Sequence, residues 1–186
     1  TELDFQFARF MSRLSGGDSP QILLAAALAS RSRREGHICV DLSSLAGKPL
    51  ADGDANGLNC PEWAPWKKAL ERSPAVGKPG DYRPLVLDGT HLYLYRYWNY
   101  EKRLAEFLKV RACSRGAEVD EPLLKDGLFR LFPGDNPKET DWQKVAAFAS
   151  VVKNFCVISG GPGTGKTFAV AKILALLLEQ SRNGYL

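Results

Sequence analysis

The residues best equipped for chemistry form the run Gly160-Gly161-Pro162-Gly163-Thr164-Gly165-Lys166-Thr167. This run has the G-x-x-x-x-G-K-T spacing of a phosphate-binding P-loop, in which glycines let successive backbone N–H groups point toward phosphate oxygens. Lys166 supplies an ammonium group for the β- and γ-phosphates, and the Thr167 hydroxyl supplies a ligand for Mg²⁺. The pattern predicts a site for a nucleoside triphosphate with Lys166 and Thr167 as its catalytic residues. A glycine-rich turn without a ligand is the alternative.

The segments on either side of this loop have the character that a P-loop requires. An apolar, strand-like run at 154–159 precedes it, and a nearly all-apolar, helix-like run from Phe168 to Leu178 follows it. The N-terminal end of such a helix adds positive potential at the phosphates. A helix this apolar is costly to expose, so further sheet is expected to cover it.

Several parts of an ATPase are missing from these 186 residues. An acidic Mg²⁺ ligand on a second strand, a group that orients water and an arginine finger are needed, yet only the segment 168–186 follows Thr167. The chain also starts at Thr1 without a methionine. We therefore expect the front portion of a larger motor protein, inactive in ATP hydrolysis by itself.

A second chemical signal lies about two dozen positions before Lys166, where Asp141 to Ala147 begin a helix-like run containing Gln143. A side-chain amide donates one hydrogen bond and accepts another, which matches the N7 acceptor and the N6 donor of adenine. We expect Gln143 to recognise the base of ATP. A glutamine on a helix without this context is ordinarily a surface residue.

The helix of Gln143 together with Ile158 to Thr167 resembles the Q motif and first helicase motif of superfamily one DNA helicases. Further blocks narrow the resemblance to the bacterial RecD family, the alpha subunits of exonuclease V. These blocks lie in order along most of the chain, at Gly36 to Ser43, at Asp88 to Trp98 with Glu101, and at Asp141 to Ala146. Phe168 departs from the small residue or threonine that many helicases carry after the P-loop, although Lys166 and Thr167 are intact.

The resemblance implies a five-prime to three-prime DNA motor that uses ATP and Mg²⁺ and acts in the repair of double-strand breaks. It implies partners as well: RecB-like and RecC-like subunits, an N-terminal domain docked on the RecC-like one, and single-stranded or duplex-end DNA held by motor domains beyond Leu186. The nuclease centre of that complex belongs to RecB, so no nuclease residues are expected here. A cytoplasmic location and no membrane partner are implied.

Composition restricts the remaining choices. An apolar content of 45% with 10% aromatic residues is enough for a packed core, and a net charge of +4 leaves nucleic-acid binding open without proving it. The four cysteines (Cys39, Cys60, Cys113 and Cys156) form no C-x-x-C pair, which argues against structural zinc. Cys39 and Cys156 lie in apolar runs, where a free thiol usually packs as a small apolar group. Together with the P-loop, free thiols indicate a reducing cytosol. No run reaches the roughly 18 apolar residues that span a bilayer.

The fold class expected is α/β, with a small N-terminal domain of helices and a β-hairpin followed by the first strand, P-loop and helix of a RecA-like parallel-sheet ATPase domain. Proline, glycine and charged residues at 133–140 mark a linker, which divides a partner-docking domain at 1–135 from the motor domain at 136–186. The expected upstream elements are helices at 3–14, 21–30, 66–72, 99–111 and 120–132, a strand at 37–42, a loop at 46–65, and a hairpin of 84–88 with 91–97.

Three patterns in the N-terminal part allow two interpretations each. The arginines between Arg31 and Arg34 suit a helix C-terminus or a phosphate contact. The segment from Asp52 begins like a calcium-binding EF-hand loop, but its twelfth position is Trp63, so a surface turn is favoured. Tyr93, Tyr95 and Tyr97 share one face of the expected strand, where they pack a core or partner or else stack single-stranded bases.

Three functions remain open at this point. The leading one is the motor subunit of a DNA-repair helicase. A docking module within a larger complex is the second, and a P-loop kinase or another ATPase is the third.

Overall fold

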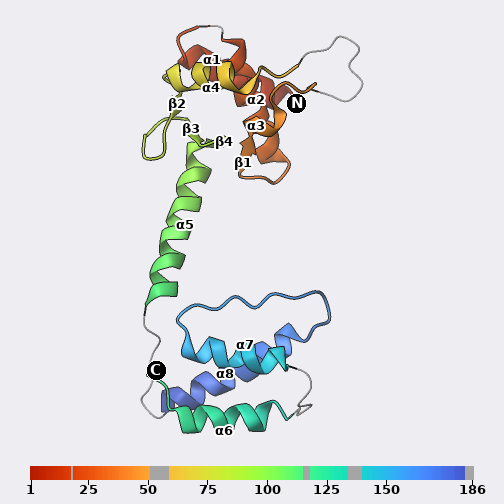
Figure 1. Ribbon diagram of the computed structural model, residues 1–186, viewed down its shortest axis with the longest axis vertical. Helices are drawn as coiled ribbons and strands as arrows, with labels where there is room; N and C mark the ends of the chain where they lie inside the picture. Colours follow the sequence, from red (N-terminus) through yellow and green to blue (C-terminus); the bar gives the residue numbers. More distant parts are fainter. Residues whose placement is uncertain (18, 51–58, 115–117, 134–139, 183–186) are drawn as a thin grey trace. The chain divides into compact units, whose positions relative to one another are not determined.

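The computed structural model describes residues 1–17, 19–50, 59–114, 118–133 and 140–182. The chain packs into two compact units, which we call unit 1 (Thr1–Arg103) and unit 2 (Leu104–Leu186). Figure 1 shows the order of their elements. Helix α5 (Tyr95–Cys113) carries the chain from one unit to the other. This division by packing lies well before the linker at 133–140, so α6 (Glu121–Leu131) packs within unit 2.

Unit 1 begins with two packed helices, as expected. They are α1 (Glu2–Leu14) and α2 (Pro20–Arg34), and the second has Ser19 at its N-cap and Pro20 at its first helical position. Alanines at the contact (Ala8, Ala25, Ala26 and Ala29) are buried and let the two backbones approach closely. The larger apolar residues of α1 point elsewhere: Leu3, Phe10 and Leu14 are exposed.

A small mixed sheet completes unit 1. Its strands are β1 (Cys39–Asp41), β2 (Val76–Gly77), β3 (Leu85–Asp88) and β4 (His91–Leu94), in the order β1-β4-β3-β2, with β2 parallel to β3 and the other pairs antiparallel. Gly89 takes a φ of +62° in the two-residue turn between β3 and β4. Helix α4 (Trp63–Arg72) inserts Trp66 and Leu70 into the core, and the Trp66 indole donates to the Gln21 carbonyl at 3.0 Å.

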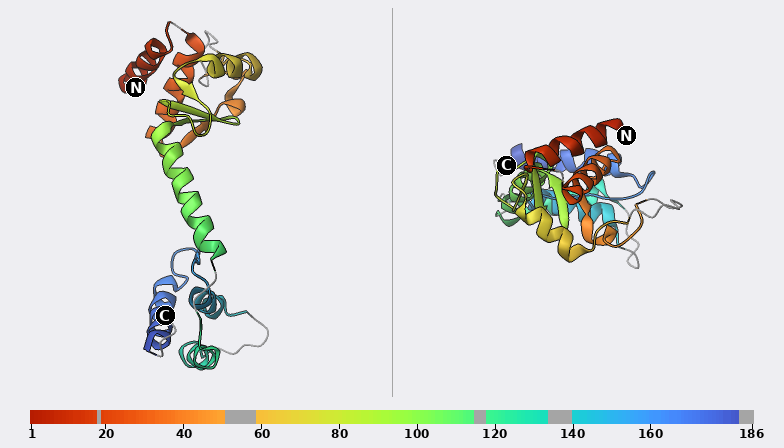
Figure 2. Two further views of the ribbon diagram at one scale, coloured as in Figure 1. Left: turned by 90° about the vertical axis from the view of Figure 1, so that its left-hand side faces the viewer. Right: turned by 90° about the horizontal axis from the view of Figure 1, so that it is seen from above.

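The prediction that Tyr93, Tyr95 and Tyr97 share one face of a strand is wrong. Strand β4 ends at Leu94, and the chain turns directly into α5 at Tyr95 (Figures 1 and 2). The ladder stops here because the next partner is Pro84, whose carbonyl accepts from the Tyr95 N–H at 2.9 Å but which has no N–H to donate in return. Tyr93 is buried in a small cluster with Val86 and Trp98, and Tyr95, now the first residue of α5, packs against that cluster.

Other upstream expectations differ in detail. Helix α4 starts at Trp63, three residues before the expected Trp66, and a single turn of helix, α3 (Leu42–Leu45), follows β1. The arginine run ends α2 as a helix terminus: Arg31 pairs with Glu35 at 2.8 Å, and Arg34 pairs with Asp4 at 3.2 Å. Most of the EF-hand-like segment at 52–63 lies outside the described residues.

Beyond the end of α5, the described residues of unit 2 form a cluster of three helices: α6, α7 (Trp142–Val152) and α8 (Lys166–Arg182). Their shared core contains Leu124, Leu128, Phe132, Ala147, Val151, Ile173 and Leu176. Gly127 allows α6 to lie close to α8, because a Cβ at this position would approach Leu176 Cδ2 to 2.5 Å. The Asp120 carboxylate caps α6 as expected, accepting from Leu123 N at 3.0 Å.

The strand expected at 154–159 is another correction. Residues 153–160 lie in an irregular segment, with Phe155 and Val157 exposed. A strand needs a neighbour for its N–H and C=O groups. All four strands found in the described part of the chain belong to unit 1, so the RecA-like parallel sheet is not seen there. Helix α8, which such a sheet would cover, exposes Val170, Leu174 and Leu178 along one side.

Candidate nucleotide-binding site

The P-loop sequence forms the connection between the irregular segment and the first residue of α8. Gly163 and Gly165 have φ values of +77° and +75°, a left-handed conformation that side chains disfavour. The loop therefore needs glycine at both positions to reverse direction. It ends at the N-terminus of a 17-residue helix, whose unpaired N–H groups favour an anion.

Lys166 lies within the turn of this loop. Its Nζ donates to the carbonyl oxygens of Gly160 at 2.7 Å and Gly161 at 2.5 Å, and lies 3.4 Å from Thr164 Oγ1. The Thr164 hydroxyl donates in turn to the Gly161 carbonyl at 3.0 Å. The ammonium charge is thus concentrated at the loop, beside the start of α8, while Thr167 is exposed one residue further along.

Gln143 is brought against the same loop, although 21 residues separate it from Thr164. Its Nε2 donates to the Thr164 carbonyl at 3.2 Å. A Cβ on Gly165 would lie 2.6 Å from this same nitrogen, so the amide occupies space that only glycine leaves free. The structure therefore brings Gln143, Thr164, Gly165 and Lys166 together in one place.

The first turn of α7 holds Gln143 in position. The Asp141 carboxylate accepts hydrogen bonds from the backbone N–H groups of Gln143 at 2.9 Å and Lys144 at 3.1 Å. Ala147 and Val151, further along α7, are buried against the unit 2 core. Cap and core together fix the helix next to the loop. A signal for this capping role was present in the sequence, because aspartate before an apolar-periodic run is a common helix start.

An apolar cavity of about 550 Å³ lies between α6 and α7. Lys144 and Phe129 both line this cavity, and the Lys144 ammonium lies 4.2 Å from the centre of the Phe129 ring. The walls of the cavity are formed mainly by Val119, Leu124, Leu128, Phe129, Phe148 and Val152. This cavity could not be predicted from the sequence, because helical spacing does not show which apolar faces of α6 and α7 meet.

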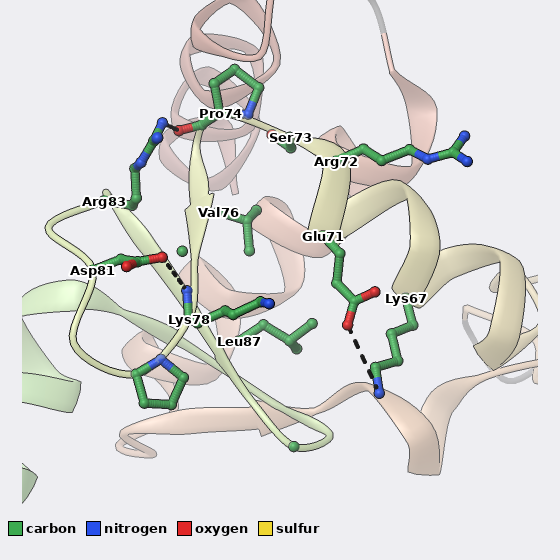
Figure 3. A pocket seen from close by; sticks show the side chains of 13 residues that line it. Lys67, Glu71, Arg72, Ser73, Pro74, Val76, Lys78, Asp81, Arg83 and Leu87 are labelled. Carbon is green, nitrogen blue, oxygen red and sulfur yellow. Dashed lines mark hydrogen bonds and ion pairs between the residues drawn. The ribbon is translucent and has the colours of Figure 1, made fainter.

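Unit 1 has a polar cavity of similar volume, about 550 Å³, between α4 and the β2–β3 connection (Figure 3). Three of its charged side chains are engaged within the wall: Lys67 pairs with Glu71 at 3.9 Å, and Arg83 donates to the Pro74 carbonyl at 2.5 Å. The backbone N–H of Lys78 donates to Asp81 at 2.9 Å. None of the residues expected at the nucleotide site lines this cavity.

Neither a preformed metal cluster nor a membrane span is found in the parts of the chain that the structure describes. There, no three His, Cys, Asp or Glu side chains lie close enough together to hold a metal ion. No helix among the described residues combines the length and apolar character needed to cross a bilayer.

Comparison with known proteins adds a family relationship. The sequence profile described as "RecBCD enzyme subunit RecD, N-terminal domain" matches residues 1–93. The chain is 36% identical over 179 residues to a "RecBCD enzyme subunit RecD" of Mycobacterium tuberculosis (strain CDC 1551 / Oshkosh), covering 96% of this chain and 28% of that protein.

Two further proteins with the same description give similar results. The Mycolicibacterium smegmatis protein is 37% identical over 96% of this chain and 29% of its own length. The Buchnera aphidicola subsp. Schizaphis graminum protein is 28% identical over 98% of this chain and 30% of its own length. The chain thus spans less than a third of the relatives that it matches.

Proposed function

The chain belongs to the RecD family of RecBCD enzyme subunits, and from that premise we propose that it is the N-terminal part of an ATP-driven DNA helicase subunit. The full-length protein would act on broken duplex ends in recombinational repair, moving five-prime to three-prime beside RecB-like and RecC-like subunits. Free cysteines, as at Cys39 and Cys60, suit a protein that works in the reducing cytoplasm.

In this proposal the P-loop of unit 2 binds the phosphates of ATP. Lys166 moves its ammonium from the loop carbonyls to the β- and γ-phosphates, and the N–H groups at the start of α8 point toward their oxygens. The Thr167 hydroxyl is an oxygen ligand of the kind Mg²⁺ prefers. Bound Mg²⁺ would neutralise charge between the phosphates during transfer to water. The left-handed glycines and the position of Lys166 fit this use.

The observation that carries the proposal is the hydrogen bond from Gln143 to the Thr164 carbonyl. A P-loop alone is compatible with many ATPases and kinases. A glutamine from a preceding helix whose amide contacts the loop backbone supports base recognition next to phosphate binding, the pairing implied by the resemblance to the Q motif. This contact favours the helicase interpretation over an unrelated P-loop enzyme.

The direct test is DNA-stimulated phosphate release by the full-length protein, assembled with its partner subunits and carrying Lys166→Gln. Loss of several kcal/mol of charge stabilisation should lower turnover more than about a hundredfold. Lys153→Gln, which changes an exposed lysine outside the loop, is the matched control and should retain turnover. Activity of the Lys166 variant within about tenfold of the parent would contradict the assignment.

A specific feature of unit 1 favours a second role, docking to another subunit. One side of α1 exposes Leu3, Phe10 and Leu14 together, at helical spacing. Contiguous apolar groups on one helix are typical of a protein contact. The profile match at 1–93 falls entirely within this unit.

Docking can be tested separately from ATP hydrolysis. Leu3→Glu with Phe10→Glu should weaken binding of the chain to a RecC-like subunit by more than tenfold, whereas Tyr82→Glu, at another exposed residue, should not. Equal binding of the two variants would show that α1 does not contact the RecC-like subunit.

A further inference from the structure

We infer that Asp141 is a positioning residue for base recognition: it holds the backbone of Gln143 while the Thr164 carbonyl holds its side chain, and together they set a preference for adenine over guanine. This inference deepens the proposed function and rests on it. It concerns residues of α7 and the loop that lie in one unit.

First, Asp141 holds the backbone of Gln143. Gln143 is the second residue of α7, so its N–H has no partner inside the helix. Asp141 Oδ1 accepts from this N–H at 2.9 Å and from that of Lys144 at 3.1 Å. One carboxylate oxygen thus holds the backbone of both Gln143 and Lys144. The fixed backbone sets the direction in which the Gln143 side chain leaves the helix.

The second step is the orientation of the amide. The Thr164 carbonyl is an acceptor, so only the NH₂ end of the Gln143 amide can face it, at the observed 3.2 Å. An amide has two N–H donors and one carbonyl oxygen. One N–H is used by the loop, and the second N–H and Oε1 remain to pair with a ligand. The absent Cβ of Gly165 gives the amide the space to lie there.

The third step is the choice of base. One donor and one acceptor match adenine, whose outer edge presents the N7 acceptor and the N6 donor. Guanine presents two acceptors, N7 and O6, so Oε1 would face another oxygen. A Gln143 whose backbone is not held can turn away from that clash. The loss of Asp141 should therefore reduce discrimination more than it reduces phosphate binding.

The test compares ATP with GTP in the full-length protein assembled with its partner subunits. Asp141→Ala should lower the ratio of kcat/KM for ATP over GTP by about fivefold or more, through KM rather than kcat. Asp141→Asn should restore the ratio to within about twofold of the parent, because asparagine caps a helix equally well. Fluorescent analogues of ATP and GTP give the same comparison in affinity without turnover.

Asp120→Ala is the matched control, because Asp120 caps α6 in the same unit by the same type of bond. It should leave the ratio unchanged. Far-ultraviolet circular dichroism should show that each variant keeps its helices. If Asp141→Ala does not, Asp141→Gly replaces it, because glycine removes the side-chain acceptor at little cost to the helix.

Each contrary outcome points to a different failure. Equal losses for ATP and GTP in Asp141→Ala would mean that the cap only stabilises α7, and would overturn the inference. Loss of discrimination in Gln143→Ala but not in Asp141→Ala would overturn it while leaving base recognition by Gln143 intact. If Gln143→Ala keeps the ratio of the parent, both the inference and base recognition by Gln143 fail.

Discussion

The side chain of Gln180, near the end of α8, hydrogen-bonds both backbone polar groups of Asp120, the residue that caps α6. Its Oε1 accepts from Asp120 N at 2.8 Å, and its Nε2 donates to Asp120 O at 3.2 Å. Gln180 is only 1% exposed, so these bonds form away from water. A buried amide that satisfies two backbone groups fixes how α6 and α8 meet, and thereby supports the helix that begins with the P-loop lysine.

We expect Gln180→Met to destabilise unit 2. Methionine fills similar volume but leaves the backbone N–H of Asp120 without its partner, at a cost of about 1–3 kcal/mol. The Asp120 carbonyl keeps its bond from Leu124 N at 2.9 Å. Hydrogen exchange of the amides in α6 and α8 measures the change. Gln6→Met, which alters an exposed glutamine of α1, should change protection of these helices by less than about 0.5 kcal/mol. Equal protection in both variants would show that the Gln180 contact is dispensable.

Gly163 and Gly165 provide a matched pair within the P-loop. Both have left-handed φ values, but only at Gly165 would a Cβ meet another group, Gln143 Nε2. Alanine at Gly163 should therefore introduce backbone strain of about 1–2 kcal/mol, and alanine at Gly165 the same strain plus a clash. We expect Gly165→Ala to weaken ATP binding more than Gly163→Ala does. In a Gln143→Ala background the two substitutions should have equal effects on affinity. A difference that persists there would have another cause.

Arg33 should contribute more to stability than its neighbour Arg31. The Arg33 guanidinium carbon lies 4.3 Å from the centre of the Tyr97 ring, joining α2 to the start of α5. Arg31 forms an exposed ion pair with Glu35. We expect Arg33→Met to lower the free energy of unfolding of unit 1 by about 1 kcal/mol and Arg31→Met by less than about 0.5 kcal/mol. Urea unfolding followed by tryptophan fluorescence makes the comparison, and the reverse order would contradict it.

Asp4 should make the stability of unit 1 sensitive to acid. Hydrogen bonds from the Thr1 hydroxyl, the Thr1 amino group and the Ser30 hydroxyl hold the pKa of Asp4 well below its usual range. Because the pKa is lower in the folded than in the unfolded state, the stabilisation is complete above the unfolded value of about 3.9 and falls as the pH drops toward the folded value.

The corresponding experiment measures melting temperatures across pH. Asp4→Asn should melt well below the parent at pH 6, and the gap should narrow below about pH 4. Asp126→Asn, at an exposed aspartate of α6, is the control and should follow the parent at both pH values. A constant gap for Asp4→Asn would mean that its carboxylate charge plays no part.

The local elements were largely predictable because short-range signals specify them. Ser19 with Pro20 starts α2, Asp120 starts α6, and the helix of Gln143 begins at the expected place. The glycine-rich loop before α8 also follows from sequence, since its positive φ values require glycine. Errors came where pairing decides conformation. The β4 strand is shorter than its aromatic alternation indicates, because Pro84 ends the ladder, and the apolar run at 154–159 has no strand beside it.

The sequence by itself determined the phosphate-binding pattern, the candidate base-recognising glutamine and the helices that carry them, because spacing, capping residues and glycine conformation act within a few residues. Only the tertiary structure decided that Gln143 rests on the Thr164 carbonyl, that Gln180 holds Asp120, and that α6 joins α8 rather than unit 1. These contacts join residues 21 to 60 positions apart. They depend on which apolar faces bury one another, and helical periodicity shows that a face exists without showing its partner.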